Sequence, residues 1–97
     1  MALYDWDDQK NRANIAKHGI DFETACRIFE RQTVDFEDTR FAYGEIRMIS
    51  IGSVANIAVL VVVHTDRHGT CRIISARKAN KQERARYEQA IRDSPDA

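Results

Sequence analysis

One stretch of the chain constrains its fold more than any other, the apolar run at residues 57–64, which ends in His64. An uninterrupted run of this length, rich in valine, is typical of a strand covered on both faces. It is far too short to span a bilayer, which takes about 20 residues as a helix. We therefore expect a sheet in which this strand is central.

Short connections on either side of the run predict an antiparallel β-meander. Further strands are expected at residues 33–36, 45–51 and 72–77, with a loop at 52–56 and a hairpin turn at 65–69. The sequence thus indicates an α+β fold with a meander of about four strands, two helices before it and one after it.

The helices are predicted from their capping residues. The first is expected at residues 6–18, with Asp5 as N-cap and Gly19 as the C-terminal stop. Asp21 would cap a second helix whose apolar face holds Phe22, Ala25, Cys26 and Phe29. Asn80 and Glu83 form a capping-box pair for the last helix, where Tyr87 anchors a thin apolar face.

Length and composition are those of a small globular protein. The chain has 97 residues, of which 43% are hydrophobic and 31% charged, so a single domain over residues 1–97 is expected. The sequence does not begin with basic residues followed by an apolar stretch, so no secretory signal is visible. Cys26 and Cys71 lack the spacing of zinc ligands. We expect a soluble, reduced, cytoplasmic protein without metal or cofactor.

Charge is unevenly distributed although the net charge is zero. Residues 1–45 hold six Lys and Arg against ten Asp and Glu, whereas residues 67–92 hold eight against two. Such asymmetry favours a basic surface that meets polyanions. The alternative is that folding mixes these charges into an ordinary solvated surface.

Scattered Glu, His, Lys and Arg residues could cleave RNA without a metal. That reaction needs a base for the 2′-hydroxyl, an acid for the leaving oxygen and cations for the phosphate. Glu45 and Arg47 are two residues apart on one predicted strand, so they share a face. They could act as a base and a phosphate clamp, or they could form a surface ion pair. His64 could be an acid or base, or a hydrogen-bonded residue at the sheet rim.

Other polar residues also have two interpretations. Lys17 and His18 could contact RNA or satisfy the C-terminal carbonyls of the first helix. Arg77 and Lys78 lie where the last strand ends, and Arg77 could hold a phosphate or bond to Glu83. Tyr87 fits a core residue better than a catalytic one.

Four segments, taken together, resemble BrnT-type toxins of type II toxin–antitoxin systems. They are Trp6-Asp7-x-x-Lys10 with Asn14, Lys17-His18-Gly19-Ile20, Phe22 and Ala25; Gly44-Glu45-x-Arg47 with Ile51-Gly52; Leu60 to Thr65; and Arg72 to Ala79 with Glu83-Arg84 and Tyr87. The resemblance runs from Trp6 to Tyr87.

The resemblance implies a RelE-like fold and a metal-independent ribonuclease that blocks translation. It also implies neutralisation by a BrnA-type antitoxin in a hetero-oligomer, which would meet operator DNA only through the antitoxin, and no contact with a membrane. The substrate would be mRNA, free or on the ribosome. The candidate catalytic residues are Glu45, His64, Arg47 and His18, and the candidate RNA-binding residues are Lys17, Arg72, Arg77 and Lys78. A non-catalytic module that binds nucleic acid or an antitoxin is the alternative function.

The predicted meander also tests whether these residues form one site. The loop at 52–56 would bring Glu45 opposite His64, and the turn at 65–69 would bring Arg72 beside His64. Arg77 would then lie near Ile57 at the other end of the sheet, about 20 Å from His64 at ~3.3 Å per residue. One scissile phosphate could not contact both.

Overall fold

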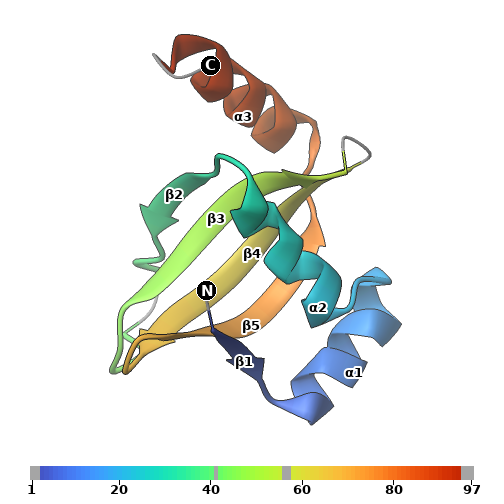
Figure 1. Ribbon diagram of the computed structural model, residues 1–97, viewed down its shortest axis with the longest axis vertical. Coiled ribbons are helices and arrows are strands. Elements are labelled where there is room, and N and C mark those ends of the chain that lie inside the picture. The colour runs from blue at the N-terminus through green and yellow to red at the C-terminus, as the bar shows by residue number, and fades with distance from the viewer. Residues whose placement is uncertain (1–2, 41, 56–57, 95–97) are drawn as a thin grey trace.

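A computed structural model describes residues 3–40, 42–55 and 58–94 of the chain (Figure 1). The elements in order are β1 (Tyr4–Trp6), α1 (Asp8–His18), α2 (Phe22–Ala25), a 3₁₀ helix η1 (Cys26–Glu30), β2 (Val34–Glu37), β3 (Arg47–Val54), β4 (Ala58–Arg67), β5 (Thr70–Lys78) and α3 (Lys81–Asp93). The α+β class predicted from the sequence is confirmed.

The sheet has five strands in the order β1-β5-β4-β3-β2. Strands β2 to β5 form the predicted antiparallel meander, and β4 is central as expected. The additional strand β1 pairs in parallel with β5, with Asp5 opposite Arg72. It was missed in the sequence because Asp5 was assigned as the N-cap of the first helix and Trp6 as the start of that helix. That helix is instead capped by Asp7, whose side chain accepts from the backbone N–H groups of Gln9 and Lys10.

The remaining helix caps agree with the sequence. Gly19 ends α1 in the left-handed conformation at φ 71°, and the Asp21 side chain accepts from the Thr24 backbone N–H at 2.6 Å. Asn80 and Glu83 form the expected capping box at the start of α3. Three of the four helical boundaries predicted from a cap therefore need no revision.

Both hairpins are tighter than predicted. Strand β3 continues to Val54, so the expected loop at 52–56 is mostly strand, and residues 56–57 lie outside the described part. Strand β4 continues to Arg67, and only His68 and Gly69 remain in the turn before β5. Both turn residues have positive φ, 55° and 85°, as two-residue hairpin turns of the primed type require.

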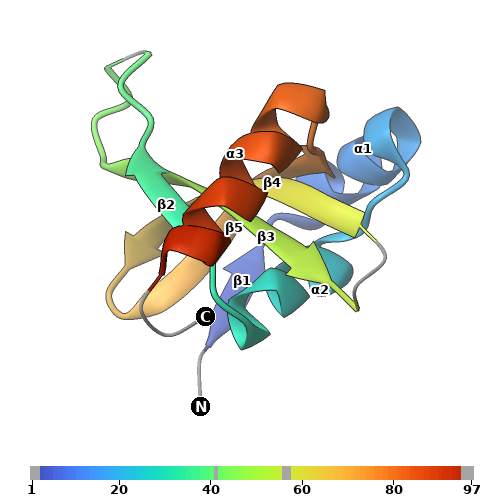
Figure 2. The same cartoon turned by 90° about the horizontal axis from the view of Figure 1, so that it is seen from above.

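The sheet separates two apolar clusters, which we call the α2 face and the α3 face (Figure 2). On the α2 face, Leu60 and Val62 of β4 pack against Phe22, Ala25 and Ile28. On the α3 face, Val61 and Ile51 pack against Tyr87, which is 9% exposed. Tyr87 is therefore a core residue, as predicted.

Helix α1 lies beyond the end of β1, along the edge of β5 (Figure 1). The buried Asn14 side chain donates to the Ala76 carbonyl at 2.7 Å and accepts from the Ala76 N–H at 3.1 Å. It also donates to the Ile20 carbonyl at 2.9 Å. Asn14 thus hydrogen-bonds the edge of β5 at Ala76, whereas β1 pairs with the same edge at residues 71–73. These bonds fix α1 against β5.

Candidate functional site

The α3 face carries most of the strand arginines. Arg47 of β3 lies opposite Thr65 of β4, and Arg72 of β5 lies opposite the same Thr65. Residues directly opposite each other share a face, and positions two apart along a strand share it too. The face therefore presents Arg47, Arg67, Arg72 and Arg77 around Val63, Thr65 and Ser75, a set that we call the arginine face.

Helix α3 covers only one end of this surface. Its buried residue Tyr87 lies over Ile51 and Val61, whereas Val63 and Ser75, further along the same face, remain half-buried. Arg86 of α3 adds a further guanidinium 5.5 Å from the Phe36 ring. The arginine face is thus bounded by α3 at one end, and at the other end Thr65 is buried and donates to the Ile46 carbonyl at 2.6 Å.

The Glu45 carboxylate contacts two of these arginines. Its Oε1 lies 3.3 Å from the Arg67 guanidinium and 3.7 Å from Arg47 Nε. The hydrogen bond from Arg67, and then the nearby positive charges, hold the pKa of Glu45 below its usual range. Glu45 precedes β3 instead of lying in it, but its predicted contact with Arg47 is present.

A buried carboxylate organises the segment that carries Glu45. The Asp38 side chain, 1% exposed, accepts from Arg40 at 2.8 and 2.9 Å and from the Tyr43 hydroxyl at 3.0 Å. The Arg40 bonds hold the pKa of Asp38 far below its usual range. The Tyr43 ring in turn lies 3.9 Å from the Arg47 guanidinium carbon. Asp38 and Tyr43 were not singled out in the sequence, where a polar loop was the only signal.

Arg77 is already engaged by the last helix. Its guanidinium donates to both carboxylate oxygens of Glu83, at 2.7 and 2.8 Å. This pairing lowers the pKa of Glu83 to about 2. The alternative that the sequence left open, an arginine bonded to Glu83, is therefore the one observed.

His64 lies on the other side of the sheet from the arginines. It is opposite Met48, one position away from the Arg47–Thr65 pair, and its ring stands edge-on to Phe29 of η1 at 5.0 Å. The predicted cluster of His64 with Glu45 and Arg72 is therefore wrong. Arg77 faces Val61 instead of Ile57, so it is about 10 Å along the strand from His64, and the two are separated by the sheet.

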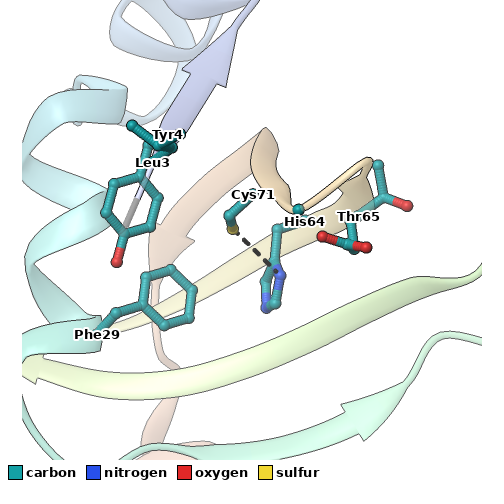
Figure 3. A pocket seen from close by; sticks show the side chains of 8 residues that line it. Leu3, Tyr4, Phe29, His64, Thr65 and Cys71 are labelled. Atoms are coloured by element: carbon teal, nitrogen blue, oxygen red, sulfur yellow. Dashed lines mark hydrogen bonds between the residues drawn. The ribbon is translucent and has the colours of Figure 1, made fainter. Parts of the chain in front are cut away.

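The surroundings of His64 suit hydrogen bonding more than phosphate chemistry (Figure 3). Ser50 Oγ donates to Asp35 at 2.5 Å, so it accepts from His64 Nε2 at 2.7 Å. His64 Nδ1 then accepts from the Cys71 thiol at 3.6 Å. Burial lowers the pKa of His64 and raises the pKa of Cys71 to about 11, so both groups are neutral at neutral pH.

These two side chains line a pocket of about 410 Å³ on the α2 face. The pocket residues are Leu3, Tyr4, Phe29, His64, Thr65, Asp66, Gly69 and Cys71, with no Lys or Arg among them. A phosphate has no cationic partner there. We therefore place the candidate site on the arginine face and not around His64.

The other predicted residues are divided between two further hollows. Lys17 and His18 line one between α1 and β5, together with Ser75 of the arginine face. Lys78 lines another with Arg27 and Asp21, on the side of the sheet opposite Arg77. Within the described residues, no group of three or more His, Cys, Asp and Glu is placed to hold a metal ion.

Comparisons with known proteins agree with this architecture. The crystal structure of the Brucella abortus ribonuclease toxin BrnT is similar in fold, with a TM-score of 0.67 and 24% identity over 84% of this chain and 100% of that one. No curated protein sequence matches. The family model described as "Ribonuclease toxin, BrnT, of type II toxin-antitoxin system" matches residues 6–83. This chain therefore belongs to the BrnT family of ribonuclease toxins of type II toxin–antitoxin systems.

Proposed function

We propose that this toxin cleaves RNA on the arginine face without a metal ion. The observation that carries the proposal is the placement of Glu45 beside Arg67 and Arg47, on a sheet face that also presents Arg72, whose guanidinium lies 3.4 Å from Asp5. A carboxylate beside guanidinium groups combines a proton acceptor with phosphate-binding cations.

In this reaction Glu45 takes the proton of a 2′-hydroxyl, whose oxygen attacks the adjacent phosphorus. The bond from phosphorus to the 5′-oxygen breaks, and that oxygen takes a proton from water. Arg47 and Arg72 bind the phosphate oxygens on which negative charge accumulates. Arg47 Nε is buried and makes no hydrogen bond among the described residues, and Glu45 Oε1 lies 3.7 Å from it, so the terminal guanidinium nitrogens of Arg47 would contact the phosphate.

Family membership supports a proposal for the partner and the location of this toxin. Membership in a type II toxin–antitoxin family implies an antitoxin partner. We propose that this is a BrnA-type protein with an acidic or amphipathic segment that covers the arginine face, because an acidic segment complements its charge. Translation would stop as mRNA is cut in the cytoplasm. Among the described residues, no helix is long and apolar enough to cross a membrane.

One observation favours the non-catalytic alternative. Two arginines already contact Glu45 and lower its pKa, which makes it a weaker base. A module that only binds RNA or its antitoxin would use the same arginines.

Cleavage of labelled RNA by the purified toxin in EDTA separates the two functions. We expect cleavage in EDTA, its loss when the antitoxin is added, and growth arrest when the toxin is expressed alone. Arg47→Ala should weaken both RNA binding and cleavage. Cleavage that requires added magnesium would remove the metal-free mechanism, and binding without cleavage or growth arrest would support the alternative.

A further inference from the structure

A basic hollow of about 290 Å³ lies beside the arginine face, between α1 and β5. Its lining residues are Lys10, Ala13, Asn14, Lys17, His18, Ile74 and Ser75, so its ionisable groups are two lysines and a histidine. Lys10 and Lys17 are seven residues apart, which places both on the same side of the helix. A carboxylate is not among the lining residues, so the hollow suits an anion.

Lys10, Lys17 and His18 form no ion pair with another described residue, although the charge of Lys10 helps to lower the pKa of Asp7. The ion pairs of Asp5, Asp38, Glu45 and Glu83 all use arginine as the cation, and none includes Lys10, Lys17 or His18. The two lysines are exposed and His18 is half-buried. Lys17 and His18 also lie in the last turn of α1, where carbonyl dipoles favour positive charge. The charges of the exposed Lys10 and Lys17 are therefore available to a ligand.

The hollow has a rigid wall. Asn14, which lines it, makes both of the hydrogen bonds that hold α1 to the Ala76 backbone. Strand β5 is irregular at the same place, because the register between β4 and β5 shifts after the Val63–Ser75 pair. The shift leaves Ile74 as an extra residue, which also lines the hollow. The lysines are thus carried on a helix that is fixed in place before any ligand arrives.

Ser75 joins the hollow to the candidate catalytic surface. It lines the hollow, and it also lies opposite Val63 on the same face as Arg77. A single-stranded polyanion bound to the arginine face can therefore continue across the edge of β5 toward Lys10 and Lys17. A compact anion could occupy only one of the two places.

We propose that this hollow is a phosphate-binding subsite for nucleotides that flank the cleaved position in RNA. The inference rests on the proposed function. Lysines contact phosphate as point charges and read no base, so the subsite adds affinity for longer RNA without sequence preference. His18, a candidate acid in the sequence, here lines the subsite instead of contacting the reacting phosphate.

Substrate length tests the subsite. The double variant Lys10→Ala/Lys17→Ala is compared with the wild type on a short oligonucleotide that covers only the cleaved bond and on an RNA extended at both ends. We expect the KM for the extended RNA to rise severalfold, with kcat unchanged and the short substrate unaffected. The slope of log affinity against log salt should fall by about 1.4, since each single-strand phosphate contact contributes about 0.7.

A matched variant controls for net charge. Lys81→Ala/Arg84→Ala removes two exposed cations from α3 and should leave both substrates unaffected. Equal losses on short and extended RNA, or equal losses in the control, would overturn the subsite. The subsite would also be overturned if Lys10→Ala/Lys17→Ala abolished competition by inorganic phosphate without any change in RNA binding. The same holds if this variant weakened antitoxin binding and left the RNA kinetics intact. If the wild type cleaves nothing, the proposed function fails, and the salt slope of RNA binding still decides on the subsite.

Discussion

Replacing Asn14 by alanine should unfold the toxin far more readily than its position on a polar helix suggests. The side chain is 7% exposed and makes three hydrogen bonds, to the Ile20 carbonyl and to both backbone groups of Ala76. A buried hydrogen bond contributes about 1 kcal/mol net, and partners left unsatisfied cost more. Asn14→Ala should therefore lower the free energy of unfolding by about 3 kcal/mol or more.

Urea titration followed by the fluorescence of Trp6, the only tryptophan, measures this loss. Asn11→Ala on the same helix is the control, because the Asn11 side chain accepts a single bond, from the Phe22 N–H at 2.9 Å. That variant should lose about 1 kcal/mol. A loss for Asn14→Ala no larger than the loss for Asn11→Ala would refute the argument that this side chain fixes α1 to β5.

Three further variants test separate contacts. Folding lowers the pKa of Glu83 to about 2, so its ionised form stabilises the fold, and this stability is lost as the pH falls from about 4.5 towards 2. Glu83→Gln should therefore lose less stability than the wild type over this pH range. Urea midpoints that fall equally in variant and wild type would contradict this. Gly52→Ala should cost about 1–3 kcal/mol by overpacking, because its Cβ would lie 2.8 Å from Ile28 Cβ; an unchanged urea midpoint would contradict it. Tyr43→Leu should weaken RNA binding about two- to fivefold by removing the ring under Arg47, whereas Tyr43→Phe should not, and equal affinities would disprove this role.

Local signals in the sequence located most of the fold. Capping residues such as Asp21 and Asn80 act within one turn of helix, and the central strand is identified by its own apolar residues. Strand β1 escaped notice because it has three residues and pairs in parallel with a strand over sixty positions away. No local pattern records such a contact.

The prediction that His64 shares a face with Glu45 was wrong because the predicted strand register was wrong. The sequence suggested Glu45 opposite His64, whereas the tighter hairpin pairs Arg47 with Thr65. The shift is an odd number of residues, and side chains alternate between faces, so His64 moved to the side opposite the arginines. The contact of Glu45 with Arg67 follows from the same observed register. That residues 1–97 form one domain stays a prediction.

The central claim is that Glu45 on the arginine face, and not His64 behind the sheet, takes part in cleavage. Single-turnover cleavage of labelled RNA in EDTA, with RNA affinity measured in parallel, compares Glu45→Gln with His64→Gln. We expect Glu45→Gln to lower the cleavage rate by about 10²–10⁴-fold with affinity nearly unchanged. His64→Gln, checked for folding by circular dichroism, should cleave at close to the wild-type rate. A folded His64→Gln protein without activity, beside a fully active Glu45→Gln, would contradict the account.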